Sequence, residues 1–125
     1  MTKPKENKVL IIDDEKSIAR ALMLKLQKEG FKIDVAFSGK EALPLLTSRK
    51  YSLVLLDLIM PGVDGFKILE ILKESKNDTP VVILSNLSDT EHEKRSKDLD
   101  ADGFYVKSDT SLEKIVKIAK SFIKE

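Results

Sequence analysis

The segment VLLDLIMPGVDG (residues 54–65) joins an apolar run to a carboxylate and then to a turn. Its first residues are typical of a buried β-strand, because they are bulky, apolar and uninterrupted. The strand ends at Asp57, and a proline and two glycines follow before residue 66, as is common in a loop that leads into a helix. A charge at the end of a buried strand costs free energy unless another group pairs with it. Other parts of the chain must therefore supply partners for Asp57.

Short apolar runs of the same kind alternate with helical patterns along the chain. The strand-like runs are 9–13, 33–37, 53–57, 81–85 and 104–106. The helical patterns cover 16–29, 39–48, the segment after the Gly62–Gly65 turn, about 89–99, and the segment from Leu112 onward. Strands that alternate with helices favour a parallel sheet with helices on both faces. The predicted fold class is therefore α/β, with a single five-stranded parallel sheet.

The composition is that of an ordinary globular domain. The chain has 125 residues, 42% of them hydrophobic, and its 22 basic and 21 acidic residues give a net charge of +1. This balance gives no support for direct binding of nucleic acid or a membrane surface. The sequence has no cysteine, no signal peptide and no apolar stretch that could span a bilayer, so we expect a cytoplasmic protein. We expect one domain over 1–125, with its core at about 8–124 after a polar extension at 1–7.

Polar residues collect at the ends of four predicted strands. Asp13 and Asp14 come at the end of the first strand, Asp57 ends the third, Ser85 ends the fourth, and Lys107 follows the fifth. Because the strand ends of a parallel sheet open on one side, these groups should meet. Three adjacent carboxylates repel one another, and oxygen ligands without His or Cys favour Mg²⁺ or Mn²⁺ over Zn²⁺. Lys107 and Ser85 would then bind a phosphoryl group, and Asp57 would be its nucleophile.

Each of these residues also has a simpler interpretation. Asp14 alone is best explained as a cap of the next helix, Lys107 alone as a loop lysine, and Ser85 alone as a helix-entry residue. The joint occurrence of five suitable groups at four strand ends favours the site. His92 lies in the most polar helix and is predicted to be a solvated surface residue. The lysines and arginines, spread along helix faces, indicate solubility rather than a binding patch.

Some helix ends and buried faces can also be predicted. A Ser or Thr followed three residues later by Glu predicts capping boxes at Ser38–Glu41, Ser88–Glu91 and Thr110–Glu113. The helix at about 89–99 has almost no apolar stripe, so its attachment to the sheet should be weak and should depend mainly on Leu99 and Leu87. In the last helix the expected buried residues are Leu112, Ile115, Ala119 and Phe122, with Ile118 toward one flank.

Four motifs together resemble the response-regulator receiver domains of two-component signalling, the CheY-like superfamily. They are IIDDE (11–15), LLDLIMPGVDG (55–65), VVILSNLSD (81–89) and DADGFYVKSD (100–109). The resemblance covers nearly the whole chain from Lys8 to Phe122. It implies a flavodoxin-like fold with strand order 2-1-3-4-5.

The resemblance also implies a role for each site residue. Asp57 matches the phosphoacceptor, which takes a phosphoryl group from the phosphohistidine of a sensor histidine kinase or phosphotransfer protein, or from a small donor. Asp13 and Asp14 match the acidic pair that binds Mg²⁺ together with Asp57 and the backbone carbonyl of Ile59. Ser85 and Lys107 match the residues that contact the phosphoryl group, and Ser85 and Phe104 match the pair that switches on activation.

Such a domain is a signalling switch rather than an enzyme, beyond its own phosphorylation and dephosphorylation. The resemblance implies that a downstream protein or output domain reads the face formed by the fourth helix, the fifth strand and the fifth helix. That face could also form a phosphorylation-dependent homodimer. Three residues depart from the usual pattern: Asn86 replaces a small residue, Asp100 a glycine, and Ser108 a proline that follows a cis peptide bond. We expect a left-handed backbone at Asp100 and a trans bond between Lys107 and Ser108.

Three other readings compete with the receiver interpretation. A Mg²⁺-dependent phosphatase with an aspartyl nucleophile would need a second aspartate in a D-x-D motif, and Asp57 is followed two residues later by Ile59. A flavin or nucleotide carrier would need a glycine-rich phosphate loop after the first strand, where this chain has IIDDEKS. A degenerate receiver that serves only for docking would normally have lost an aspartate or the lysine.

Overall fold

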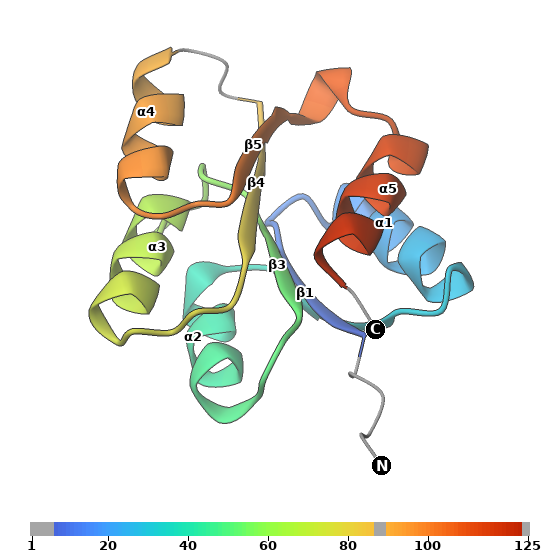
Figure 1. Cartoon of the computed structure of the whole chain (residues 1–125), viewed down its shortest axis with the longest axis horizontal. Helices are drawn as coiled ribbons and strands as arrows, with labels where there is room; N and C mark the ends of the chain where they lie inside the picture. Colours follow the sequence, from blue (N-terminus) through green and yellow to red (C-terminus); the bar gives the residue numbers. More distant parts are fainter. Residues whose placement is uncertain (1–6, 87–89, 124–125) are drawn as a thin grey trace.

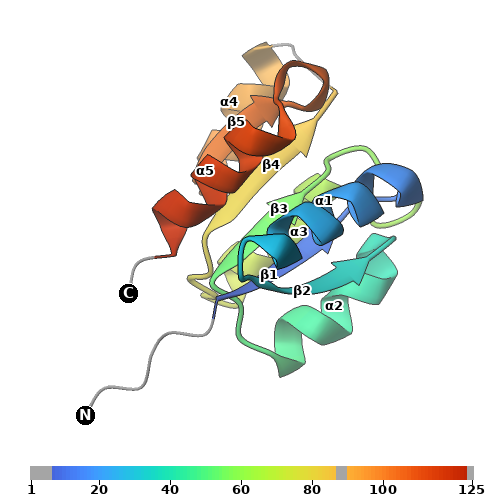
Figure 2. The ribbon, with the colours of Figure 1, turned by 90° about the vertical axis from the view of Figure 1, so that its right-hand side faces the viewer.

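The computed structural model describes residues 7–86 and 90–123, which contain one parallel sheet of five strands. The strand order is β2-β1-β3-β4-β5, as the family resemblance implied (Figure 1 labels β1 and β3–β5, and Figure 2 labels all five strands). The strands are β1 (Lys8–Ile12), β2 (Lys32–Ala36), β3 (Leu53–Leu56), β4 (Val81–Ser85) and β5 (Gly103–Val106). The predicted fold class and strand order are therefore confirmed.

Helices cover both faces of the sheet (Figure 2). One face carries α1 (Lys16–Lys28) and α5 (Leu112–Phe122), and the other carries α2 (Gly39–Ser48), α3 (Gly65–Glu74) and α4 (Thr90–Asp98). A short 3-10 helix, η1 (Lys107–Asp109), connects β5 toward α5. No helix among the described residues combines the length and apolar character needed to cross a membrane.

The central strands are apolar without interruption because they are buried on both sides. Alternate residues of β1 point into different cores: Leu10 and Ile12 pack with α2 and α3, whereas Val9 and Ile11 pack with α1 and α5. The residues of β3 divide in the same way. In the edge strand β2, Asp34 instead accepts hydrogen bonds from Tyr51 Oη at 2.7 Å and Arg49 Nη1 at 2.9 Å. Ile33 and Val35 of β2 pack against the core on the α1–α5 side, so this edge strand is amphipathic.

The helix caps agree only in part with the predicted capping boxes. Ser38 Oγ accepts a hydrogen bond from the Glu41 N–H at 3.1 Å, so the first cap is confirmed. The cap predicted at Thr110 is wrong, because the Thr110 hydroxyl donates to the carbonyl of Val106 at 2.7 Å. Ser111 instead caps α5, and its Oγ accepts from the Lys114 N–H at 3.1 Å. The predicted box at Ser88–Glu91 and the predicted contact of Leu87 involve residues outside the described ranges.

The buried face of α5 also differs from the expected one. Ile118, expected at a flank, is only 7% exposed, whereas Leu112 is 37% exposed. Leu112 is the first residue of the helix, so no preceding helical turn covers it. Ile118 follows Ile115 by three residues and lies on the same helical face, next to Ala119. The buried face is therefore rotated relative to the one predicted.

Aromatic and cationic side chains attach α4 to α3. The Phe66 ring, which is 4% exposed, stacks on His92 with ring centroids 5.8 Å apart, and the Arg95 guanidinium carbon lies 4.0 Å from its centroid. A guanidinium over an aromatic face is attracted by the ring's quadrupole. His92 is therefore half-buried against a ring rather than solvated, which corrects the prediction for this residue.

The C-terminal end of α4 is held by polar contacts. Lys73 Nζ donates to the carbonyl of Asp98 at 3.0 Å and lies 3.7 Å from the Asp100 carboxylate. Asp100 has a φ of +68°, which confirms the left-handed backbone expected there. The Asp102 carboxylate accepts a hydrogen bond from the Val81 N–H at 2.8 Å. Although α4 itself has almost no apolar residue, polar and cation–π contacts fix one flank and one end of it.

Replacing Arg95 with Ala should weaken the attachment of α4. We expect the free energy of unfolding to fall by about 0.5–1 kcal/mol, the size of an exposed cation–π contact. Amide hydrogen exchange should become faster mainly in α4. Lys97→Ala is the matched control, since Lys97 is exposed on the same helix and has no ion pair among the described residues. Because Arg95 Nη2 also lies 3.8 Å from the Glu70 carboxylate, equal effects of the two variants would show that neither Arg95 contact contributes measurably to the free energy of unfolding.

Candidate functional site

The ends of β1 and β3 lie level at one edge of the sheet, and β4 and β5 extend two residues further. In the parallel ladder, Ile12 is paired with Leu56 and Leu56 with Ile83. The N–H of Asp57 donates to the carbonyl of Ile12 at 2.9 Å, which places Asp57 directly beside the end of β1. The sequence expectation that the strand-end residues meet depends on this register, and the structure confirms it.

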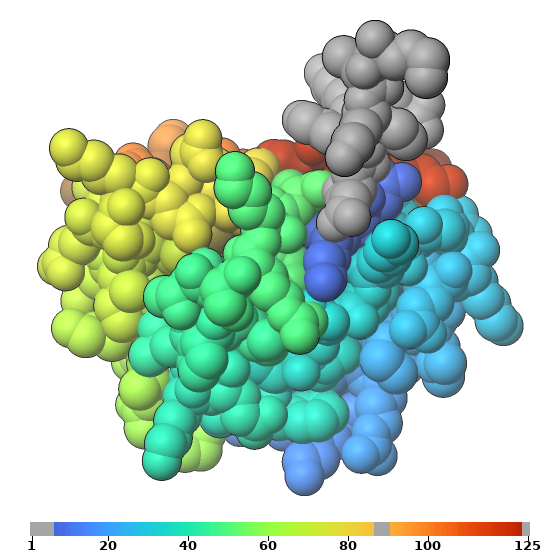
Figure 3. All heavy atoms as spheres, turned by 90° about the horizontal axis from the view of Figure 1, so that it is seen from below, coloured from blue at the N-terminus to red at the C-terminus, as the bar shows by residue number. Residues whose placement is uncertain are grey.

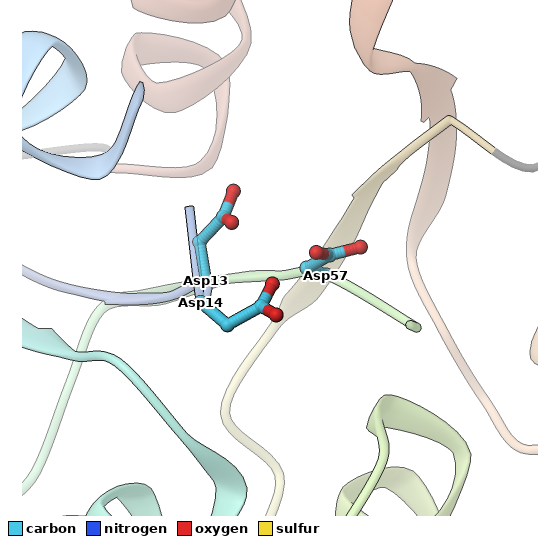
Figure 4. A group of neighbouring side chains, drawn as sticks. All are labelled: Asp13, Asp14 and Asp57. Carbon is cyan, nitrogen blue, oxygen red and sulfur yellow. The ribbon is translucent and has the colours of Figure 1, made fainter. Parts of the chain in front are cut away.

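Three carboxylates gather at this edge. Asp13 and Asp14 follow β1 and Asp57 follows β3, and carboxylate oxygens of the three lie within 4.8 Å of one another (Figure 4). Asp13 and Asp57 are only 3% and 5% exposed, and Asp14 is the most exposed of the three. The local loops orient them, because Asp13 Oδ1 accepts from the Glu15 N–H at 2.9 Å and Asp57 Oδ1 accepts from the Ile59 N–H at 3.3 Å.

The ammonium group of Lys107 enters the same space from the end of β5. Its Nζ lies 2.8 Å from Asp13, 3.0 Å from Glu15 and 3.5 Å from Asp57, and the Lys107 side chain is 7% exposed. Burial alone would lower the pKa of Lys107, but hydrogen bonds to the Asp13 and Glu15 carboxylates outweigh it and raise the pKa. Lys107 is therefore a permanent positive charge at this edge.

Glu15 is a residue of this site that the sequence patterns did not predict. It immediately follows the predicted acidic pair, and its contact with Lys107 joins residues 92 positions apart in the chain. The run of three acidic residues in IIDDE was the available signal, but an acidic residue before a helix has a common alternative role as a cap.

The carboxyl group of Asp57 has an unusual protonation equilibrium. Burial is the main cause that raises the pKa of Asp57 from its ordinary value of 3.8 to about 6; the charge of Lys107 opposes this shift, and the charge of Asp13 adds to it. The carboxylate is therefore the main form at neutral pH, although it is costly to keep in place. A bound cation would reduce that cost.

A cavity of about 370 Å³ opens beside these groups. Its lining includes Asp14, Glu15, Asp57, Ile59, Ser85, Asn86 and Lys107. Ser85 is buried at the end of β4, and the side chain of Asn86 is exposed at the rim. The Ile59 side chain is 55% exposed, and the metal-binding role expected for its carbonyl oxygen stays a prediction.

A larger hollow, of about 890 Å³, lies at the opposite end of the molecule. It is bordered by the end of α2, the loop before β4 and Phe122, and none of the predicted site residues lines it. Figure 3 views the molecule from this end. The volume of a hollow is therefore a poor guide to the site here, whereas the carboxylates and the buried lysine identify the smaller cavity.

The remaining predicted positions have defined places. Phe104, on β5, is half-buried, packs against the core on the α2–α3 side and borders a small groove with Ser96 of α4. No peptide bond among the described residues is cis, so the bond between Lys107 and Ser108 is trans, as expected.

The donor set fits a hard divalent cation. All the nearby anionic donors are carboxylate oxygens, and two of the three carboxylates in the cluster are buried. Mg²⁺ is commonly bound by one or two carboxylates, waters and a phosphate. The cavity beside Asp57 leaves room for such additional ligands, and Lys107 and Ser85 lie on its wall.

Comparisons with known proteins agree with this geometry. The chain is 35% identical over 100 residues to the response regulator ArlR of Staphylococcus saprophyticus. The aligned region covers 80% of this chain and 45% of that protein. The receiver domain of the Francisella response regulator 1452 superposes with a TM-score of 0.88 at 34% identity, over 94% of this chain and 96% of that one. The response regulator TrrA of Thermotoga maritima, solved in complex with Mg²⁺ and beryllium fluoride, gives a TM-score of 0.82 at 33% identity, over 93% and 98% of the two chains.

The curated relatives are longer than this chain, which spans about half or less of their length. The sequence model of the response regulator receiver domain matches residues 9–120, which include every predicted site residue. Together with the strand order and the grouped carboxylates, this match shows that the chain belongs to the response regulator receiver domain family.

Proposed function

We propose that Asp57 is the phosphoacceptor of a signalling switch. The observation that carries the proposal is a buried carboxylate within 3.5 Å of a buried lysine and within 4.8 Å of two further carboxylates, beside a cavity. In the proposed reaction an Asp57 oxygen attacks phosphorus, the P–N bond of a phosphohistidine breaks, and the imidazole leaves with the bonding electron pair. The donor is a sensor histidine kinase, a phosphotransfer protein or a small phosphorylated molecule.

The neighbouring residues have separate roles in this reaction. Lys107 neutralises negative charge that develops on the phosphoryl oxygens, and the buried hydroxyl of Ser85 donates a hydrogen bond to one of them. Asp13, Asp14, Asp57 and the carbonyl of Ile59 would hold Mg²⁺, with Mn²⁺ as an alternative. The cation supplies the charge neutralisation that lets an anionic donor approach three carboxylates.

Phosphorylation would be read on the surface formed by α4, β5 and α5. Ser85 and Phe104 are the proposed switch residues: Ser85 moves toward the phosphoryl group and Phe104 turns inward beside α4. Because α4 is held mainly by polar contacts, the turn of the Phe104 side chain is sufficient to shift α4 and so to alter this surface. A downstream protein, an output domain or a second phosphorylated copy is the proposed partner, without direct binding of nucleic acid or a membrane by this chain.

The chain is proposed to act as a switch and not as an enzyme that turns over a separate substrate. Its chemistry would be limited to its own phosphorylation and dephosphorylation. We also propose a single receiver domain over 1–125 with a core at about 8–124, in agreement with the family match at 9–120. The cytoplasm is the proposed location, because the family's phosphodonor is expected there.

Incubation with acetyl phosphate and Mg²⁺ should add one phosphoryl group to the protein, measured by intact-mass spectrometry. The added mass should require Mg²⁺, disappear in mild base and be absent in Asp57→Asn, because Asp57 is buried, contacts Lys107 and lines the cavity, whereas the equally buried Asp13 does not line it. Asp109→Asn is the control, since Asp109 is an exposed acid close to Lys107 in sequence. Equal phosphorylation of Asp57→Asn would exclude Asp57 as the acceptor.

Replacing Asp14 with Ala should weaken Mg²⁺ binding about tenfold or more, because an anionic oxygen ligand is lost. The affinity can be measured by following backbone amide shifts during a Mg²⁺ titration. Glu41→Ala, which changes an acidic residue at the start of α2, serves as the control. An unchanged affinity in Asp14→Ala would remove Asp14 from the proposed ligand set.

The raised pKa of Asp57 predicts a pH-dependent stability without Mg²⁺. Between pH 4 and 6 the folded protein binds more protons at Asp57 than the unfolded chain, whose pKa stays near 3.8, so the free energy of unfolding falls as pH rises. Asp57→Asn should lack this loss, which is on the order of 2–3 kcal/mol. Urea titrations at pH 4 and 7 measure the difference, and saturating Mg²⁺ should reduce it. If the free energies of unfolding of the variant and the wild type differed by the same amount at pH 4 and at pH 7, the prediction would be contradicted.

A further inference from the structure

Lys107 has three carboxylate partners, and the proposed phosphoacceptor is the most distant of them. The Nζ is 2.8 Å from Asp13, 3.0 Å from Glu15 and 3.5 Å from Asp57. In this state the ammonium group is held toward the β1 end of the site. A phosphoryl group on Asp57 would be an additional anionic partner for the same ammonium group.

Glu15 differs from the other two partners in its relation to the metal cluster. Asp13 and Asp57 belong to the group of carboxylates whose oxygens lie within 4.8 Å of one another, and Glu15 does not. A cation bound to that cluster would share the charge of Asp13 and Asp57 and weaken their hold on Lys107. Glu15 would keep its full charge and remain a partner of Lys107.

The local structure leaves the Glu15 carboxylate free to change partner. Glu15 occupies the N-cap position of α1, but its side chain makes no capping hydrogen bond. The contact that fixes the loop uses its backbone N–H, which donates to Asp13 Oδ1. Its side chain is 46% exposed, whereas that of Lys107 is 7% exposed, so the Glu15 carboxylate can rotate into water at little cost.

We propose that Glu15 is a positioning residue that competes with the phosphoryl group for Lys107. The inference rests on the proposed function and adds a residue that sets how readily the switch is phosphorylated. As long as Glu15 is paired with the Lys107 ammonium group, the positive charge of Lys107 interacts less strongly with the phosphoryl group on Asp57. Release of this ion pair accompanies phosphorylation, and the competition slows the reaction and weakens the contact of Lys107 with the phosphoryl group.

Glu15→Gln removes the charge and keeps the backbone hydrogen bond to Asp13. A partly exposed ion pair has a modest energy, so we expect acetyl phosphate to phosphorylate the variant about twofold to fivefold faster in saturating Mg²⁺. The affinity for beryllium trifluoride, a phosphoryl mimic, should increase by a similar factor in a titration followed by backbone amide shifts. Mg²⁺ alone should bind the variant no more tightly than wild type, because a negative charge has been removed.

A double-mutant cycle separates competition for Lys107 from a general charge effect. In a Lys107→Met background, Glu15→Gln should change neither the phosphorylation rate nor the beryllium trifluoride affinity, since the shared partner is gone. Asp109→Asn is the matched control, because it removes an exposed charge two residues from Lys107 without removing an ion pair found among the described residues. That control should behave as wild type.

Three results would overturn the inference alone: no change in Glu15→Gln, an equal gain in the Lys107→Met background, or an equal gain in Asp109→Asn. Failure of the wild-type protein to be phosphorylated on Asp57 is a different outcome, which would overturn the proposed function and this inference with it. The absence of a Glu15→Gln effect in the Lys107→Met background cannot be attributed to unfolding if the amide spectra of the variants retain the dispersion of wild type.

Discussion

The ion pairs of the Lys107 ammonium group are the interaction on which the functional end of the sheet depends. Asp13, Asp14, Glu15 and Asp57 bring four negative charges to the site, and Lys107 is the cation within 3.5 Å of three of them. Without Lys107, the buried carboxylates of Asp13 and Asp57 would lose their close positive partner, which costs several kcal/mol when charges are buried. Burial and, to a smaller extent, the charge of Asp13 still raise the pKa of Asp57, and the excess of negative charge makes the cluster suited to a divalent cation.

The sheet and the carboxylates could be predicted because both follow from local sequence patterns. A strand buried on both faces needs an uninterrupted apolar run, as in β1, β3 and β4, and the predicted bounds of all five strands agree with the structure to within one residue at each end. Parallel strands then bring their ends to one edge, so Asp13, Asp57, Ser85 and Lys107 could be grouped from sequence alone. The strand order came from the family resemblance, since alternation alone leaves several orders open.

The features that could not be predicted depend on contacts between distant segments. The pairing of Glu15 with Lys107 and the stacking of His92 on Phe66 each join residues that no sequence spacing relates. At the start of α5, Thr110 and Ser111 are both good caps, and the choice depends on whether the Thr110 hydroxyl is already bonded to Val106. Local propensity identifies both candidates, and tertiary contacts select between them.

The same end of the sheet is connected to α4 by direct packing contacts through α3. Gly65 begins α3, and a side-chain carbon there would overlap the carbonyl oxygen of Asp57 and lie within 2.6 Å of Leu58 Cα. The start of α3 therefore packs directly on the backbone of Asp57, and the next residue, Phe66, carries the ring that holds Arg95. A shift of the Asp57 backbone would move Phe66, because glycine leaves no compressible side chain between them. Helix α4 is thus linked to the Asp57 region through α3 as well as through β5, and both links must be compatible with any position that α4 adopts.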